Sequence, residues 1–422
     1  MELTRIYLRR IEERDPALSA FVFVSPRRAL LTAALWDRAR RRHRAPQSPL
    51  SGVPIGIKDL NLVAGMPVKF GSRAYSWMIS PVHDETTRRL VDAGTIVVGK
   101  LSTSELGAMP VTEPDIHPPT RNPWDLSRTA GGSSGGSGAA VAAQLVPIAQ
   151  GSDGGGSIRI PAAFNHLFGM KASAGLMGHT KMGDNLTLVV QGGLCRTVAD
   201  SAAMHDLLTI GTPDATTAPP PAPGLRIGLS LDNILGPTDP DIAAAVHRLA
   251  KILVDLGHHV EESPWVDISP KEFLVLWSRT VADAPVPRES VLQPVTRWLR
   301  QEGRKITADQ VVRQKAMLAQ RIEAWFGAFD LRLSPTVPTA PPKVDSWRAE
   351  NPAASFDRIV PIGSYTAVYN VSGQPAMAIP LGLSSEGLPL SAQIAGKKGQ
   401  DAQLFALARQ IETAVGGFSR HP

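Results

Sequence analysis

Two turns rich in glycine and serine, separated by a short apolar stretch, constrain the fold of this chain more than any other feature. They lie in GGSSGGSGAAVAAQLVPIAQGSDGGGSIR, residues 131–159. Gly/Ser tracts are usually flexible linkers. Here the intervening GAAVAAQLV carries strong helix formers at an apolar spacing, and the second turn runs straight into apolar, β-branched residues. The pattern therefore favours two ordered turns over a linker.

Helix-like and strand-like segments alternate along the chain, which favours an α/β protein with a mixed or largely parallel sheet. The helices are expected at residues 2–14, 26–43, 84–94, 139–146, 239–257, 270–282, 306–329 and 400–414, and the strands at 52–60, 95–100, 331–335 and 376–381. Ser25 is expected to cap the second helix, which has Pro26 at its first position. The Pro-rich residues 211–224 are expected to form a surface loop of one domain, because a strand-like segment follows them at once.

Composition excludes several classes of function. The chain has 422 residues, a formal net charge of +6 and 43% hydrophobic residues, as in an ordinary globular protein. The basic run DRARRRHR, residues 37–44, has no aromatic residues among its arginines, so it indicates a solvated helix end and not a nucleic-acid site. No stretch has the roughly 18 consecutive apolar residues that a membrane span needs.

Metal and redox chemistry are not expected either. The single cysteine, Cys195, excludes an intrachain disulfide and a cysteine-based metal site. The ten histidines lack the paired spacing of metal ligands. We therefore predict a protein without a metal, a cofactor, a nucleic-acid partner or a membrane partner. Its charged N-terminus has no apolar signal region, which favours a cytoplasmic location.

Two short motifs match known active-site patterns only in part. GTIVVGKL, residues 94–101, lacks the Ser or Thr that follows the lysine of a phosphate-binding loop, and its middle is typical of a strand. GGSSG, residues 131–135, fits the nucleophile elbow of Ser-His-Asp hydrolases, but no apolar strand precedes it. In that second interpretation His258 or His259 would be the base.

A different serine and a lysine suit acyl chemistry better. Gly154, Gly155 and Gly156 precede Ser157, and three glycines in a row can turn several N–H groups toward one oxyanion. Lys58 ends the strand-like VPIGIKD, where it shares a face with small residues that would leave room beside a buried amine. A lysine at its usual pKa of ~10.4 is a poor base, but burial disfavours its charged form. An isolated strand-end lysine is more often solvated.

The chain resembles the amidase signature family of serine hydrolases over nearly its whole length. The resemblance rests on PLSGVPIGIKDLNLVAGMP, TRNPWDLSRTAGGSSGGSGAAVAA, GSDGGGSIRIPAAFNHLFGMK and YNVSGQPAMAIPL, in that order. It implies one amidase signature domain over residues 1–422, folded as an α/β/α sandwich around a mixed, largely parallel sheet. The region 225–330 is compact and variable.

The resemblance also implies a role for each site residue. Ser157 matches the nucleophile, Ser133 the bridging serine that in the family follows a cis peptide, and Lys58 the general base. The backbone N–H groups of Gly154, Gly155, Gly156 and Ser157 match the oxyanion hole. Asp153 and Arg159 match supporting residues that brace the loop.

The activity implied by the resemblance is hydrolysis of a carbon–nitrogen bond in a small-molecule amide. Anilides, carbamates and amide oligomers are candidate substrates, and a homodimer is a family-level expectation. Two alternatives stay open: the A subunit of a tRNA-dependent amidotransferase, which releases ammonia from glutamine, and a non-catalytic scaffold.

Some residues depart from the family pattern. Gly154, Gly193 and Ser102 stand where many members have other residues. These changes leave the three catalytic residue types in place and put the substrate pocket in doubt. Leu60, Asn61 and the segments 176–188 and 289–298 could contribute to the pocket or equally to the core.

Overall fold

The computed structural model describes residues 1–177, 188–233, 235–418 and 420–422. The α-helices are α1 (Glu2–Leu18), α2 (Pro26–Arg41), α3 (Glu85–Asp92), α4 (Gly135–Ala142), α5 (Arg159–Phe164), α6 (Val198–Leu208), α7 (Pro240–Asp255), α8 (Pro270–Asp283), α9 (Pro294–Arg304), α10 (Ala308–Phe326), α11 (Pro352–Ile359), α12 (Val368–Ser372) and α13 (Asp401–Ala414). Short 3₁₀ turns are η1 (Arg73–Tyr75), η2 (Glu105–Gly107), η3 (Glu289–Val291) and η4 (Val360–Gly363).

The strands are β1 (Phe21–Val24), β2 (Pro54–Lys58), β3 (Ile96–Leu101), β4 (Arg121–Asn122), β5 (Asp125–Thr129), β6 (Ile148–Asp153), β7 (Phe168–Lys171), β8 (Val190–Cys195), β9 (Arg226–Leu229), β10 (His259–Glu262), β11 (Leu331–Pro335), β12 (Ala376–Leu383) and β13 (Pro389–Gly396). In the described part of the chain, all of them except the β4–β5 pair join an 11-stranded sheet in the order β1-β3-β2-β6-β8-β7-β12-β13-β11-β9-β10. The predicted α/β fold around a mixed sheet is confirmed.

Parallel pairing forms two blocks within this sheet. β2 runs parallel to β3 and β6, and β9 runs parallel to β10 and β11. The strands between the blocks pair antiparallel, as β12 and β13 do across a short turn. The sheet is therefore parallel within these two blocks and antiparallel between them. β6 lies at the boundary, since it pairs parallel with β2 and antiparallel with β8.

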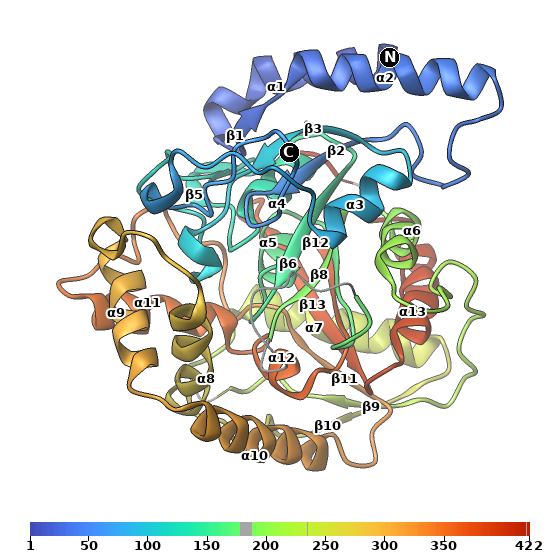
Figure 1. Ribbon diagram of the computed structural model, residues 1–422. Helices are drawn as coiled ribbons and strands as arrows, with labels where there is room; N and C mark the ends of the chain where they lie inside the picture. The colour runs from blue at the N-terminus through green and yellow to red at the C-terminus, as the bar shows by residue number, and fades with distance from the viewer. Residues whose placement is uncertain (178–187, 234, 419) are drawn as a thin grey trace.

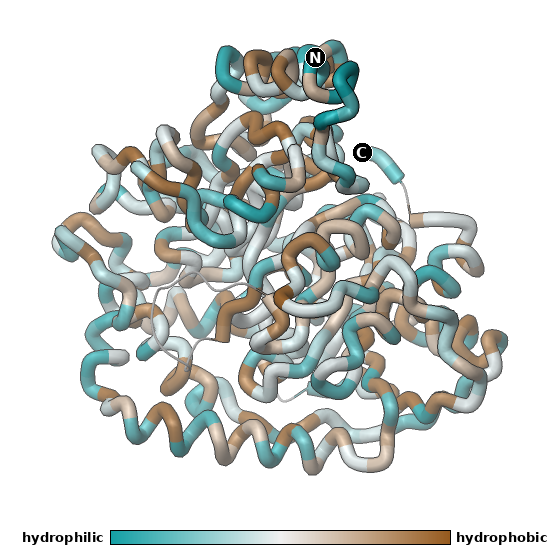
Figure 2. The backbone as a smooth tube through the Cα atoms, turned by 45° about the vertical axis from the view of Figure 1, so that its right-hand side comes forward, coloured by the Kyte–Doolittle hydropathy of each residue, from teal (hydrophilic) through white to brown (hydrophobic). Residues whose placement is uncertain are grey.

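Helices cover the sheet on both faces (Figure 1). α4 and α5 pack on one face, while α6, α7 and α13 pack on the other. α8, α9, α10 and α11 contact one another and form a helical layer beside the sheet, and α1 and α2 pair at the β1 edge. The backbone coloured by hydropathy alternates between polar and apolar residues along the outer helices (Figure 2). Each outer helix thus buries one face, as α10 does with Val311, Leu318 and Ile322.

Most of the predicted elements form, with shifted ends. α4 begins at Gly135, inside the first Gly/Ser turn, and not at residue 139. Ser25 stands at the N-cap of α2, but its side chain makes no capping hydrogen bond there. Residues 211–224 have no helix or strand and are mostly exposed, as expected of a surface loop.

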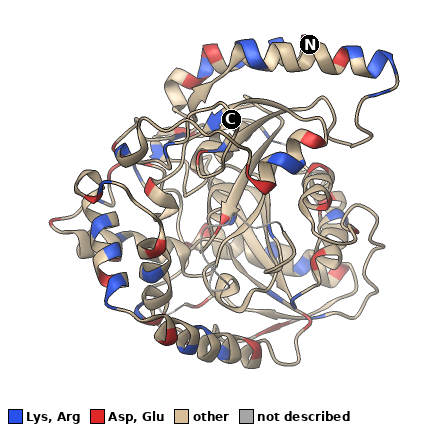
Figure 3. Ribbon diagram, in the orientation of Figure 1, with Lys and Arg blue, Asp and Glu red and all other residues tan. Residues whose placement is uncertain are grey.

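The basic run at 37–44 lies at the C-terminal end of α2, where its arginines are exposed (Figure 3). This agrees with the interpretation as a solvated helix end. Residues 94–101, which match a phosphate-binding loop only in part, contain strand β3. Their Lys100 is buried in an ion pair with Asp59, with Nζ 2.8 Å from Oδ1. Lys100 is therefore not free to bind a phosphate. Among the described helices, none combines the length and apolarity that a membrane span requires.

Candidate active site

Lys58 ends β2, a strand in which every residue is buried. Its amine donates to Ser133 Oγ at 2.8 Å, to Ser152 Oγ at 3.0 Å and to the Ser152 carbonyl at 3.4 Å. Burial lowers the pKa of Lys58 to about 7, against the opposing effect of the Asp153 carboxylate. The expected room beside Gly56 is absent, because the Leu101 side chain lies there. The amine is therefore fully buried and held by two hydroxyl groups.

Ser133 lies in the first Gly/Ser turn, immediately before α4. The Gly132–Ser133 peptide bond is cis, which the resemblance implies for the bridging serine. Thr112 holds this turn, because its hydroxyl donates to the Ser133 carbonyl at 3.2 Å and accepts from the Gly135 N–H at 3.0 Å. A Cβ on Gly132 would lie 2.7 Å from the Val111 backbone, so only glycine fits at that position.

The second turn folds around the Asp153 carboxylate at the end of β6. This carboxylate accepts from the N–H groups of Gly156 at 2.8 Å, Ile158 at 3.1 Å and Arg159 at 3.4 Å. The Arg159 guanidinium binds both of its oxygens, at 2.9 and 3.0 Å. Burial would raise the pKa of Asp153, but the guanidinium holds it well below its usual range. The Asp153 carboxylate and the Arg159 guanidinium therefore hold the loop in its curved shape.

Arg159 also ties the turn to the C-terminal part of the chain. Its remaining N–H groups donate to the Thr366 carbonyl, Gln393 Oε1 and Asn370 Oδ1, at 2.9, 2.7 and 2.7 Å. The Asn370 amide in turn donates to the Asp153 carbonyl at 2.9 Å. The turn is therefore held by Asp153 and also by residues that lie more than 200 positions further along the chain than Arg159.

The two Gly/Ser turns lie next to each other. The Ser134 N–H donates to the Ser157 carbonyl at 3.3 Å. Ser157 is 7% exposed, and its hydroxyl makes no hydrogen bond, to Ser133 or to any other residue, in the described part of the chain. The structure thus joins Lys58 to Ser133 directly and places Ser157 in the neighbouring turn.

One predicted oxyanion donor has another partner. The Gly156 N–H is bound to Asp153, so its function here is to brace the turn. The N–H groups of Gly154, Gly155 and Ser157 have no acceptor among the described residues. Gly156 has a φ of +126°, and a Cβ there would lie 2.2 Å from Thr366 Oγ1. Only glycine can therefore give the loop this shape.

A pocket that opens to solvent lies beside Ser157 and Gly155, with about 910 Å³ of empty space when its solvent-filled mouth is included. Apolar and aromatic side chains make up most of its wall. They include Met109, Ile160, Leu235, Trp265, Ile268, Phe273, Trp277, Phe356, Val360, Val368 and Val371. Its polar side chains besides Ser157 are Asn233, Ser269 and Ser364, and the described lining contains no charged residue. Such a pocket favours an uncharged ligand.

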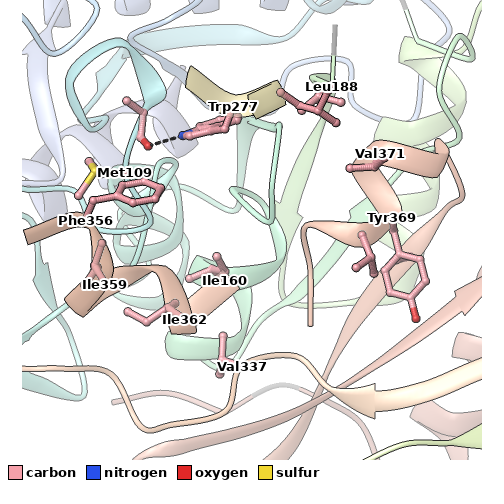
Figure 4. Close-up of a cluster of buried hydrophobic side chains, with 14 of the residues drawn as sticks. Met109, Ile160, Leu188, Trp277, Val337, Phe356, Ile359, Ile362, Tyr369 and Val371 are labelled. Carbon is pink, nitrogen blue, oxygen red and sulfur yellow. Dashed lines mark hydrogen bonds between the residues drawn. The ribbon is translucent and has the colours of Figure 1, made fainter. Parts of the chain in front are cut away.

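Two aromatic side chains of α8 close the pocket over the glycine turn. Trp277 and Phe273 stack with ring centroids 5.9 Å apart. A Cβ on Gly154 would lie 3.1 Å from the Trp277 ring, and one on Gly155 would lie 3.4 Å from the Phe273 ring. The Trp277 indole donates to the Ala108 carbonyl at 3.0 Å, and Met109 and Phe356 lie side by side near it (Figure 4). The two glycines therefore leave space for this aromatic wall.

Comparisons with known proteins identify the family of this chain. The family model "Amidase" matches residues 2–405. The chain belongs to the amidase signature family. It is 36% identical to a Synechocystis sp. protein named "Putative amidase", over 99% of this chain and 86% of the relative. It is also 32% identical to the 6-aminohexanoate-cyclic-dimer hydrolase of Paenarthrobacter ureafaciens, over 98% and 93% of the two chains.

A solved member of the amidase signature family, a bacterial aryl acylamidase, has the same fold. It superposes with a TM-score of 0.88 at 26% identity, over 98% of this chain and 92% of that one. This protein is accordingly an amidohydrolase that acts on carbon–nitrogen bonds of small-molecule substrates. The interpretation of residues 131–135 as a nucleophile elbow is disfavoured, since His259 begins β10, seven strands from β6 and roughly 34 Å away along the sheet at ~4.8 Å per strand.

Several residues of this amidase site were not predicted from the sequence. Ser152 binds the Lys58 amine, and Thr112 and Asn370 bind the two Gly/Ser turns, yet isolated polar residues give no signal before the fold is known. Among the candidate pocket contributors, Leu60, Asn61 and residues 289–298 do not line the pocket. Of residues 176–188, positions 178–187 lie outside the described part of the chain. The pocket wall comes instead mainly from residues 107–110, 265–277 and 356–371.

Proposed function

We propose that this protein hydrolyses uncharged amides through an acyl-enzyme on Ser157, with Ser133 and Lys58 as a proton relay. The observation that carries the proposal is the buried Lys58 amine, 2.8 Å from Ser133 Oγ and with a pKa of about 7. At neutral pH about half of such amines are uncharged and can accept a proton. A lysine at its ordinary pKa would not be a useful base under these conditions.

The relay has two proton transfers. The neutral amine of Lys58 takes the proton of the Ser133 hydroxyl, and Ser133 takes the proton of Ser157. The second transfer requires a hydrogen bond from the Ser157 hydroxyl to Ser133 Oγ, which the described residues do not make in this structure. Catalytic hydrogen bonds commonly form only once substrate is bound. Ser157 Oγ then bonds to the amide carbon, and the carbonyl oxygen becomes an oxyanion.

The oxyanion is placed on the unpartnered N–H groups of the glycine turn, those of Gly154, Gly155 and Ser157. As this intermediate collapses, the carbon–nitrogen bond breaks and the relay returns a proton to the leaving amine. Water then attacks the acyl-enzyme through the same relay and releases the carboxylic acid. The two turns supply the nucleophile, the relay and the oxyanion donors together.

The substrate class follows from the pocket wall. Because its described lining is apolar, aromatic or neutral, we place an uncharged acyl group there, as in aliphatic amides, anilides, carbamates and amide oligomers. Glutamine carries a charged amine and carboxylate, for which this lining offers no partner, so the amidotransferase alternative is not favoured.

A substrate panel with matched variants tests the proposal. Amine release is measured from anilides, aliphatic amides, carbamates and glutamine, for the wild-type protein and for Ser157→Ala. We expect the wild-type protein to hydrolyse the uncharged substrates and to hydrolyse little glutamine. We expect Ser157→Ala to hydrolyse neither. A Ser157→Ala protein that retains the wild-type rate contradicts the mechanism.

A further inference from the structure

Gly107 lines the pocket at the point where the pocket comes close to Ser133. It belongs to the wall that also contains Ser157, and it is buried. A Cβ on Gly107 would lie 3.5 Å from Ser133 Oγ and 2.9 Å from Leu60 Cδ1. Beyond its own turn, no other atom of the described residues lies within 4 Å of that Cβ position. Because a side chain at residue 107 would meet only two neighbours, its absence leaves open space at the Ser133 end of the pocket.

The turn that carries Gly107 is held in a fixed shape. Gly107 has a φ of +70°, a left-handed conformation that glycine adopts without strain. On one side of it, the Leu106 N–H donates to the Phe70 carbonyl at 2.8 Å. On the other side, the Met109 N–H donates to Ser104 Oγ at 3.2 Å. The open space beside Ser133 is therefore part of the pocket before any substrate binds.

The proposed reaction requires a proton donor for the leaving nitrogen. When the carbon–nitrogen bond breaks, Ser157 Oγ is bonded to the acyl carbon and carries no proton. Ser133 therefore gives its proton to the nitrogen and regains one from the Lys58 ammonium, 2.8 Å away. For this transfer the nitrogen must come within about 3 Å of Ser133 Oγ. A substituent on that nitrogen then extends into the space beside Gly107.

We infer that Gly107 selects the leaving amine, because its missing side chain admits a carbon substituent on the scissile nitrogen. The substrate class is a secondary amide, such as an N-alkyl amide or an anilide. A primary amide releases ammonia and would leave the space beside Gly107 unfilled. The neighbouring wall residues Ala108, Met109 and Pro110 are apolar, which suits an uncharged carbon group. This inference rests on the proposed function and adds selectivity for the leaving group to it.

Two ratios of kcat/KM test the inference. The amine ratio compares N-propylbutanamide with butanamide, which share an acyl group and differ only in the substituent on nitrogen. The acyl ratio compares the hexanoyl and acetyl 4-nitroanilides, which share a leaving amine and differ in the acyl chain. Each reaction is followed by release of its amine or ammonia. We expect the wild-type enzyme to hydrolyse N-propylbutanamide with a kcat/KM at least equal to that for butanamide.

One variant and a matched control change residue 107 and a distant glycine. Gly107→Ala places a methyl group 3.5 Å from Ser133 Oγ. It should lower the amine ratio at least ~10-fold and change the acyl ratio less than ~2-fold, since the added methyl group fills only the space for the leaving amine. Gly387→Ala is the control, because Gly387 is exposed, has a similar φ of +77° and has no described atom within 4 Å of its Cβ position. It should keep both wild-type ratios, and a general loss of activity cancels in each ratio.

A second variant covers the case in which Gly107→Ala does not fold. The added Cβ would lie 2.9 Å from Leu60 Cδ1, so Leu60→Ala is combined with Gly107→Ala to remove that contact. The double variant keeps the methyl group beside Ser133 and should show the same fall in the amine ratio. Leu60→Ala alone should not lower this ratio.

The results separate this inference from the proposed function. Suppose that the wild-type enzyme hydrolyses these substrates and Ser157→Ala does not. If the amine ratio is then unchanged in the Gly107 variants, or the acyl ratio falls in its place, selection by Gly107 is wrong and the mechanism stands. The same conclusion follows if the wild-type enzyme hydrolyses butanamide and not N-propylbutanamide. If the wild-type enzyme hydrolyses none of the substrates, or Ser157→Ala retains activity, the proposed function is wrong and this inference is overturned with it.

Discussion

The Lys58 amine and the Ser133 hydroxyl lie 2.8 Å apart, although 75 residues separate them in the sequence. Lys58 ends a buried central strand, and Ser133 stands in the turn before α4, which packs on that strand. The contact therefore depends on the packing of a helix against the sheet, and it places a hydroxyl group beside an amine with a pKa of about 7.

Activity should depend on pH through Lys58. The amine must be neutral to act as a base, so kcat/KM for an uncharged anilide should rise about tenfold per pH unit below about 7 and level off above it. Lys58→Arg should lose at least ~10³-fold, because the guanidinium stays charged over this range. A rate that falls as pH rises from 6 to 8 would contradict this assignment.

Replacing Ser157 or Ser133 by alanine should lower the rate of hydrolysis without lowering the stability of the fold. Ser157→Ala should lose at least ~10⁴-fold in kcat/KM, as when a covalent nucleophile is removed, and Ser133→Ala should lose at least ~10²-fold. Melting temperatures within a few degrees of wild type would show that the loss is chemical. Labelling by a serine-reactive phosphonate, located by mass spectrometry, should occur at Ser157 in wild type and disappear in Ser157→Ala.

The glycine turn gives a prediction about stability. Gly156→Ala should destabilise the protein by about 2–4 kcal/mol, because alanine is strained at a φ of +126° and its Cβ would meet Thr366 Oγ1 at 2.2 Å. Gly155→Ala is the matched control, since its Cβ would meet its nearest neighbour, Phe273, at 3.4 Å. Urea denaturation of both variants measures the difference, and equal midpoints would be inconsistent with the described turn.

The buried Asp153–Arg159 ion pair should contribute more to the free energy of unfolding than an exposed ion pair does. Arg159→Met should cost about 3–5 kcal/mol, because it leaves a buried carboxylate without its cation. Arg226→Met, which removes the exposed pair with Glu261, should cost less than about 1 kcal/mol. Because the pKa of folded Asp153 lies below its usual value, the stabilisation is present above pH ~4 and is lost as pH falls further. Denaturation curves at pH 7 and pH 3 test both statements.

Local sequence patterns predicted the parts of the fold that depend on local chemistry. Apolar spacing predicted the long helices α1, α2, α7, α8, α10 and α13 and the strands β2, β3, β11 and β12. The consecutive glycines at 154–156 indicated a turn with available N–H groups. The sequence did not predict that the Gly156 N–H binds Asp153, because that bond depends on the curvature of the turn. It also did not predict the start of α4, since Gly135, Gly136 and Gly138 disfavour a helix until packing on β6 stabilises it.

Long-range contacts were the part that the sequence could not give. The pocket wall joins residues 107–110 to residues 265–277 and 356–371, and nothing in their local patterns predicts that they meet. The same holds for Asn370 and Gln393, which bind Arg159 from far along the chain. Lys58, Ser133 and Ser157 were proposed through a resemblance over the whole length of the chain, and their roles stay predictions until the variants are measured.

Titration of the Lys58 amine by NMR tests the central claim most directly. Lysine labelled with ¹³C at Cε is incorporated into the protein, and the Lys58 resonance is assigned by its loss in Lys58→Met. Lys171→Met serves as the control, because burial lowers the pKa of Lys171 to about 7 as well. We predict that the Lys58 resonance titrates near pH 7 in the resting enzyme; a midpoint above pH 9 would show that the amine is charged under working conditions and would contradict the relay.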